Sequence, residues 1–141
     1  MFSDHVLTLL APGQGSQTPG MLTEWLTDAE AADRIAAWSE ATGLDLTALG
    51  TTATAEEITD TAVTQPLVVV SALLSYAQLR ARHGRIPADT VVAGHSVGEL
   101  AAAAISGVIT DDEAVRLAAI RGAADKLRTK LDAWVEKQRG Y

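Results

Sequence analysis

One serine stands in a setting that is typical of an enzymatic nucleophile. Ser96 is the centre of a Gly-x-Ser-x-Gly pattern within residues 93–99, Ala-Gly-His-Ser-Val-Gly-Glu. An apolar run over residues 90–93 precedes the pattern, and an alanine-rich helical stretch over residues 100–105 follows it. A strand that turns at once into a helix holds its serine in a strained, exposed position, and the flanking glycines let the backbone pass. We therefore predict that Ser96 is a nucleophile and that the Val97 amide donates to the oxyanion.

A serine nucleophile needs a general base, and the sequence offers three histidines for that role. His5 lies at the start of the first predicted strand, and His83 lies at the end of a predicted helix beside a glycine. His95 adjoins Ser96, but neighbouring side chains diverge at a sharp elbow, so we expect His95 to be a packed neighbour of the site. Because a neutral hydroxyl is a weak nucleophile at pH 7, we expect little or no turnover from this chain alone.

The composition indicates a single folded domain and excludes several kinds of partner. The chain has 141 residues, of which 48% are hydrophobic, and this suits one folded domain with a single core. It has no cysteine, so it forms no disulfide and no thiolate metal site, and we expect no bound metal. The net charge of −7 argues against nucleic acid as a partner. No secretory signal and no apolar run of about 20 residues is evident, so we expect a cytoplasmic protein without a membrane partner.

The hydrophobic pattern predicts two short strands that alternate with helices. Strands are expected over residues 5–10 and 90–93, and helices over residues 29–41, 54–57, 66–83, 100–105 and 110–138. One or two helical turns are expected over residues 21–26. Pro66 is expected in the first turn of the long helix, and capping boxes are expected at Thr54 and Thr110. A strand–helix–strand order implies a parallel pair with a right-handed connection. Two strands make an unusually small parallel sheet, which we expect to be unfinished.

Charge divides the chain into two regions. Residues 1–124 carry 6 basic and 15 acidic side chains, whereas residues 125–141 carry 5 basic and 3 acidic ones, including all three lysines. The second region is predicted to be an amphipathic helix, because it carries an apolar stripe formed by Leu127, Leu131, Trp134 and Val135. Its origin is not apparent from the sequence.

Four motifs together resemble one enzyme family. They are Ala11-Pro-Gly-Gln-Gly-Ser-Gln17 after the first strand, Thr64-Gln-Pro66, the elbow at Ser96, and Ala119-Ile-Arg-Gly122, whose arginine follows the serine by 25 residues. In this order and spacing, residues 6–122 resemble the malonyl-CoA:acyl carrier protein transacylases. The acyltransferase domains of polyketide and fatty acid synthases show the same pattern, so a role in fatty acid or polyketide biosynthesis is expected.

The resemblance implies a two-step acyl transfer through an acyl-serine. Ser96 would take the malonyl group from malonyl-CoA and pass it to the phosphopantetheine thiol of acyl carrier protein. The amides of Gln14 and Val97 would form the oxyanion hole, and Arg121 would bind the malonyl carboxylate through two parallel hydrogen bonds. Gln65 is expected to contribute to substrate binding. No bound cofactor is implied.

The family also sets the expected fold. The resemblance implies an α/β structure: a truncated α/β-hydrolase-like core of the acyltransferase fold, with a few parallel strands flanked by helices. Residues 1–124 would be a partial acyltransferase core, and residues 125–141 a basic amphipathic helix. The family's small ferredoxin-like subdomain and its downstream catalytic histidine have no counterpart in this sequence. We expect self-association or a partner chain to cover the unfinished sheet.

Other interpretations compete with the transacylase. The chain could be a non-catalytic remnant that binds an acyl group or a carrier protein, or a shortened or designed chain whose last helix covers exposed core. A general serine hydrolase or thioesterase fits the elbow but does not explain Arg121. A dinucleotide-binding turn after the first strand is disfavoured, because Thr18 stands where a third glycine belongs.

Overall fold

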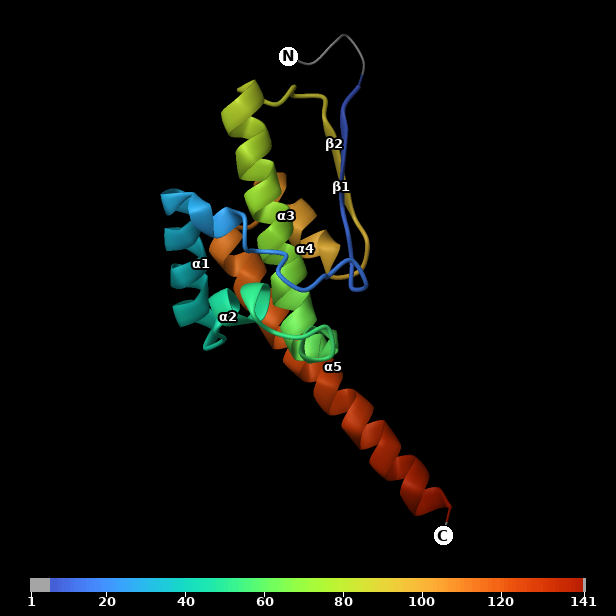
Figure 1. Cartoon of the computed structure of the whole chain (residues 1–141). Helices are drawn as coiled ribbons and strands as arrows, with labels where there is room; N and C mark the ends of the chain where they lie inside the picture. The colour runs from blue at the N-terminus through green and yellow to red at the C-terminus, as the bar shows by residue number, and fades with distance from the viewer. Residues whose placement is uncertain (1–5, 141) are drawn as a thin grey trace.

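The structure, a computed structural model, describes residues 6–140 and contains a two-stranded parallel sheet (Figure 1). Strand β1 (Thr8–Ala11) pairs with β2 (Val91–Gly94) in a register that joins Thr8 to Val91 and Ala11 to Gly94. The helices are α1 (Ala29–Thr42), α2 (Leu46–Thr51), α3 (Thr61–His83), α4 (Gly98–Ile105) and α5 (Asp111–Arg139), with 3-10 turns at Trp25–Thr27 and Glu57–Thr59. The predicted parallel pair and the α/β class are confirmed.

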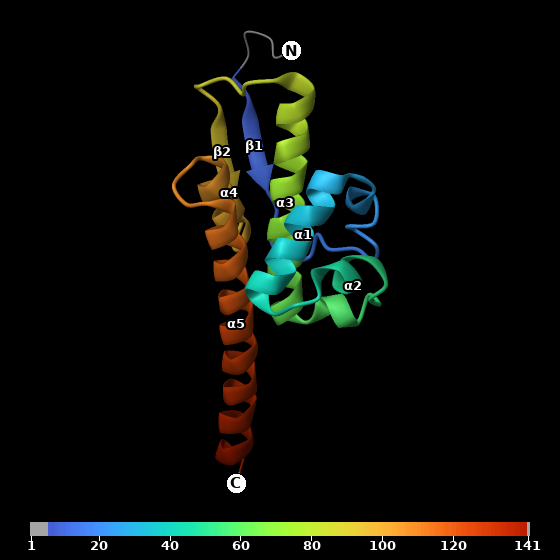
Figure 2. The same cartoon turned by 90° about the vertical axis from the view of Figure 1, so that its left-hand side faces the viewer.

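Helices lie on one side of the sheet. In Figures 1 and 2 both α3 and α4 are on the same side of the two strands. Side chains alternate along a strand, so Leu9 and Val92 point toward the helices while their neighbours point away. Leu10 is 76% exposed on the open face, and Val91 is exposed there as well. Within the described residues, the second face of the sheet has no covering layer.

The core lies between the helices rather than against the sheet. α3 packs along α5, and α1 closes the side of this pair. Two polar contacts fix α1 to the start of α5: Trp38 Nε1 donates to Asp112 Oδ1 at 2.8 Å, and Arg34 forms an ion pair with Asp111. The largest fully buried side chains include Trp38, Leu22, Ile35, Leu46, Ile58, Leu67, Leu73 and Val115.

The start of α3 corrects the sequence-based prediction. The helix begins at Thr61 rather than at Pro66, because the Asp60 side chain caps it by accepting a hydrogen bond from the Ala62 amide at 3.0 Å. Pro66 therefore lies inside the helix, where its missing N–H removes one hydrogen bond to the Ala62 carbonyl. α2 was not predicted, and the one or two helical turns expected over residues 21–26 correspond to a 3-10 turn at Trp25–Thr27.

α3 is also long and apolar. Its 23 residues, with a mean hydropathy of 1.4 over an 18-residue window, meet the length and composition of a membrane-crossing helix. Half of that window is buried inside the protein, against α4 and α5, as in the core helix of a globular domain. This is weak evidence for a membrane span.

α5 is the longest element and leaves the body of the protein. Its capping box forms as predicted, with Glu113 N donating to Thr110 Oγ1 at 3.1 Å and Thr110 N donating to Glu113 Oε2 at 2.7 Å. The helix continues to Arg139, close to the predicted end. In Figures 1 and 2 its last turns project past every other element.

Candidate functional site: a nucleophile elbow with an arginine

Ser96 occupies the predicted elbow between β2 and α4. β2 ends at Gly94, α4 begins at Gly98, and Ser96 lies between them with a φ of 54°. It is the only residue other than glycine with a positive φ in the described part of the chain. This left-handed conformation is costly for an L-residue, and such strain is typical of functional positions.

Two glycines make the elbow sterically feasible. A Cβ at Gly98 would lie closer than 3.0 Å to the carbonyl oxygens of Ala11 and Pro12. A Cβ at Gly94 would lie closer than 3.0 Å to the backbone of Gly98. The elbow is therefore pressed against the end of β1, and this contact brings the loop after β1 beside the serine.

Arg121 reaches Ser96 from α5. Its Nη2 donates to Ser96 Oγ at 3.1 Å. The next residue, Gly122, allows this approach, because a Cβ there would lie 2.6 Å from the Thr61 carbonyl oxygen at the start of α3. The structure thus brings together the predicted nucleophile and the predicted carboxylate-binding residue. A cation beside the serine hydroxyl is suited to an anionic acyl group.

A line of polar side chains runs behind the site and holds Gln14. Thr61 Oγ1 donates to Gln14 Oε1 at 2.9 Å and accepts a hydrogen bond from Gln65 Nε2 at 3.0 Å. Gln65 Nε2 also donates to Asp125 Oδ2 at 2.8 Å. This line, the Gln14–Thr61–Gln65–Asp125 chain, connects the loop after β1 with α3 and α5. Neither Thr61 nor Asp125 was predicted from the sequence, although each stands four residues from a predicted site residue on the same helix face.

Gln65 is one layer behind the site rather than at the serine. Its side chain is buried between α3 and α5, and its Oε1 is a buried acceptor without a hydrogen-bond partner in the described structure. Both of its Nε2 hydrogens are used by Thr61 and Asp125. Direct substrate binding by Gln65 stays a prediction, and the contacts it makes are those of a residue that orients Gln14.

The described histidines do not supply a base at Ser96. The His95 ring packs over Gly13, where an added Cβ would lie 2.8 Å from His95 Nδ1. Within residues 6–140, no hydrogen bond joins the His95 side chain to Ser96. His83 ends α3 near the start of β2, whereas the elbow follows the other end of that strand (Figure 1). His5 falls outside the described residues.

Among residues 6–140, no three His, Cys, Asp or Glu side chains come together closely enough to hold a metal ion.

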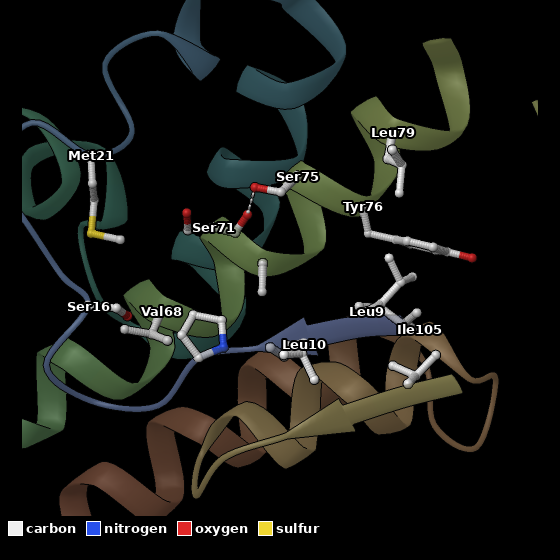
Figure 3. A pocket seen from close by; sticks show the side chains of 14 residues that line it. Leu9, Leu10, Ser16, Met21, Val68, Ser71, Ser75, Tyr76, Leu79 and Ile105 are labelled. Atoms are coloured by element: carbon white, nitrogen blue, oxygen red, sulfur yellow. Dashed lines mark hydrogen bonds between the residues drawn. The ribbon is translucent and has the colours of Figure 1, made fainter. Parts of the chain in front are cut away.

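A hollow of about 400 Å³ lies between α3 and the strands (Figure 3). Its walls are mostly apolar, with Leu9 of β1 facing Tyr76 and Leu79 of α3. Neither Ser96 nor Arg121 lines it, so this hollow is separate from the elbow.

Comparison with known proteins agrees with this geometry. The profile of a family described as "Acyl transferase domain" matches residues 8–130. A malonyl CoA-acyl carrier protein transacylase of Mycobacterium tuberculosis is 62% identical over 118 residues, which are 84% of this chain and 39% of that protein. The protein of the same name from Escherichia coli strain K12 is 40% identical over 112 residues, or 79% of this chain and 36% of that protein. The chain therefore spans about two-fifths of the length of these relatives.

Solved structures share the fold. The crystal structure of MCAT from Mycobacterium tuberculosis matches with a TM-score of 0.75 and 60% identity, covering 84% of this chain and 39% of that one. A malonyl-transacylase, PlMCAT, solved in complex with the type II PKS acyl-carrier protein AntF, matches with a TM-score of 0.74 and 33% identity, covering 84% and 38%. The family resemblance read from residues 6–122 is confirmed.

Proposed function

Because the chain belongs to the acyl transferase domain family, we propose that Ser96 accepts a malonyl group from coenzyme A and passes it to acyl carrier protein. The observation that carries this proposal is the 3.1 Å hydrogen bond from Arg121 Nη2 to Ser96 Oγ. It places a permanent cation beside the nucleophile, where the free carboxylate of a malonyl ester would lie. We further propose that the protein acts in the cytoplasm, in fatty acid or polyketide biosynthesis.

The first half-reaction loads the serine. Ser96 Oγ attacks the thioester carbonyl of malonyl-CoA, forming a C–O bond, and the serine proton goes to water or to an added base such as imidazole. The resulting oxyanion would be held by the amides of Val97 and Gln14. Collapse of the tetrahedral intermediate breaks the C–S bond, and coenzyme A leaves as a thiolate that takes up a proton. Malonyl-Ser96 remains.

The second half-reaction transfers the malonyl group from Ser96 to the carrier protein. The phosphopantetheine thiol of the carrier protein gives up its proton and attacks the ester carbonyl. The same two amides stabilise the oxyanion, and the C–O bond to Ser96 breaks as Oγ regains a proton. No redox step and no cofactor enters this balance.

Arg121 would select the acyl group. Its guanidinium can give two parallel hydrogen bonds to the malonyl carboxylate, and an acetyl group offers no partner for them. In the present structure Arg121 donates to the serine instead. A bound carboxylate would draw the guanidinium away from Oγ and leave the hydroxyl free to attack.

The described part of the chain provides no base at the serine, so we propose that loading is slow. His95 packs on Gly13, and His83 lies toward the other end of β2. In serine hydrolases, loss of one triad member lowers the rate by about 10⁴–10⁶ and leaves the contribution of the oxyanion hole and binding. Added imidazole should therefore accelerate loading by acting as a diffusible base.

Intact-mass spectrometry tests the proposal directly. The protein is incubated with malonyl-CoA, with and without imidazole, and the labelled residue is identified by peptide mapping. We expect one malonyl group on Ser96, formed slowly and faster with imidazole. Ser96→Ala should abolish the label, and Ser106→Ala, at an exposed serine after α4, should not. Labelling of another residue contradicts the assignment of the nucleophile, and stoichiometric labelling within minutes contradicts the slow step.

A non-catalytic acyl-binding protein is the second candidate, and the arginine without a nearby base is the observation that favours it. Such a protein would bind malonyl-CoA through Arg121 without forming an ester. Calorimetric titration of malonyl-CoA into Ser96→Ala separates the two. Binding without any label on the unmodified protein, even with imidazole, would favour the second candidate.

A further inference from the structure

The exposed part of α5 carries an apolar stripe with coiled-coil spacing. Ile120, Ala124, Leu127, Leu131 and Trp134 follow one another at alternating steps of four and three residues. This is the spacing of the a and d positions of a heptad repeat. Leu127, Leu131 and Trp134 are 54–61% exposed, and Ile120 is exposed as well. The stripe is therefore a continuous apolar seam that the body of the protein does not bury.

No other described element of the chain covers this seam. In Figures 1 and 2 the last turns of α5 project beyond the body, away from the strands and from α1 and α2. A short helical segment that projects from the body of a protein is only marginally stable in water. Burial of an apolar face is what usually stabilises such a segment. The family profile ends at residue 130, so Leu131 and Trp134 lie beyond the part shared with the family, whereas the first three residues of the seam lie within it.

We propose that this seam pairs with the same seam of a second copy in an antiparallel two-helix coiled coil. Antiparallel pairing places Leu127 opposite Leu131 of the second copy. The neighbouring layers then set Ala124 opposite Trp134, a small side chain facing the largest one in the seam. The outer layers set Ile120 opposite Gln138. Every layer between Ala124 and Trp134 is apolar in both copies.

Size complementarity fixes the direction of the pairing. A parallel pair would stack Trp134 on Trp134 and Ala124 on Ala124, so one layer would be crowded and another would be empty. Overpacked and underpacked layers both destabilise a helical interface. The antiparallel register avoids both faults, and its twofold symmetry closes the assembly at two copies.

Charge gives the dimer a distinctive response to salt. Arg128 and Lys130 flank the seam near its centre, and both are exposed. In the antiparallel pair these cations approach their counterparts in the second copy, so electrostatics oppose an association held by apolar layers. Because salt screens exposed charges, we expect association to strengthen as ionic strength rises. Pairing of the seam with an acidic helix of another protein would instead weaken as ionic strength rises, because salt would screen the attraction between opposite charges.

Sedimentation equilibrium of the whole chain at low and high salt tests whether the seam mediates dimerisation. We expect a monomer–dimer equilibrium that Leu131→Lys weakens at least tenfold, while Thr129→Lys, which adds the same charge outside the seam, leaves it within about twofold. Leu10→Lys, on the open face of the sheet, should also leave it unchanged. A monomer at all salt concentrations overturns the proposal. So does a dimer that survives Leu131→Lys but is lost with Leu10→Lys.

Disulfide trapping tests the direction, and the absence of native cysteine removes any background. Leu127→Cys and Leu131→Cys proteins are oxidised separately and as a mixture. We expect the mixture to form a cross-linked dimer and each protein alone to form little. Efficient cross-linking of either protein with itself would indicate parallel pairing and overturn the antiparallel register.

Discussion

Arg121 and Ser96 are joined by a hydrogen bond of 3.1 Å, although one belongs to a long helix and the other to a strained turn after a strand. The contact depends on the close approach of α5 to the start of α3 at Gly122. The acceptor at the other end of this contact belongs to a residue with a left-handed backbone, since Ser96 has a φ of 54°. Nucleophile and cation are thus positioned by separate elements that meet at one point.

Replacing Arg121 should remove the preference for malonyl groups. Charge-assisted hydrogen bonds contribute about 1.5–3 kcal/mol, so Arg121→Ala should weaken malonyl-CoA binding by about 10–100-fold. Acetyl-CoA binding, which lacks the carboxylate, should change little. Arg121→Lys should fall between, because an ammonium cannot reproduce the bidentate contact. Isothermal titration with both thioesters provides the measurement.

Arg128→Ala is the matched control for charge, because it removes an exposed arginine two turns further along α5. It should leave both affinities unchanged. An equal loss in Arg121→Ala and Arg128→Ala would show that only the overall charge of α5 matters.

Thr61 should affect the chemistry through Gln14. Thr61→Val removes the donor to Gln14 Oε1, a contribution of about 1 kcal/mol, and should slow malonyl loading of Ser96 by about fivefold. Thr61→Ser keeps the hydroxyl and should restore the rate. A double-mutant cycle with Gln14→Ala, followed by single-turnover mass spectrometry, checks whether the two residues act together. Strictly additive effects would mean that the Gln14–Thr61–Gln65–Asp125 chain does not position the loop.

The elbow should not tolerate a side chain at Gly98. Gly98→Ala forces a Cβ against the carbonyl oxygens of Ala11 and Pro12, and overpacking of this kind costs about 1–3 kcal/mol. Urea denaturation should show a correspondingly lower free energy of unfolding. The control is Gly140→Ala, where the nearest atoms lie 3.7 and 3.8 Å away, and this change should stay within about 0.5 kcal/mol of the unmodified protein. Equal stability of both variants would argue against the tight contact.

Asp60 should make stability depend on acid pH. The hydrogen bond from Lys126 lowers the pKa of the Asp60 carboxyl, and the Ala62 amide lowers it further, while partial burial opposes them. Its folded pKa is therefore below its unfolded pKa of about 3.9. The stabilisation is complete above that unfolded value and is lost as the pH falls through the folded pKa.

Urea midpoints at pH 7 and pH 3 measure this effect. Asp60→Asn should be less stable than the unmodified protein at pH 7, and the difference should shrink at pH 3. Lys126→Ala should reproduce part of this pattern, whereas Lys137→Ala, far along the projecting helix, should not. A constant difference between Asp60→Asn and the unmodified protein at both pH values would rule out the ionised carboxylate as the cause.

The features predicted correctly from the sequence are those that depend on residues adjacent in the chain. The elbow at Ser96 follows from a strand, two glycines and a helix that are adjacent in sequence, and the capping box at Thr110 is likewise local. The start of α3 was misplaced because Pro66 gave a strong signal while the cap at Asp60, which decides the boundary, was overlooked. α2 is only 6 residues long and has little periodicity to detect.

Contacts between residues far apart in the chain could not be predicted from local sequence patterns, except where the family motifs include both residues. Gln65 and Asp125 are 60 residues apart, and no local preference indicates that they meet. The position of His95 over Gly13, rather than toward Ser96, likewise depends on how the loop after β1 packs against the elbow. The role of Gln65 behind the site could be seen only once α3 and α5 had been placed together.

The length of α5 has a thermodynamic consequence for the site. One uninterrupted helix carries both Arg121 and the seam, which begins at the neighbouring Ile120, so a tilt of α5 displaces both. If occupation of the seam changes the affinity of the serine site for an anionic acyl group, then that acyl group must change the affinity of the seam by the same factor. Binding of the acyl group at Ser96 and pairing of the seam would then be coupled through α5, and substrate concentration would influence dimerisation.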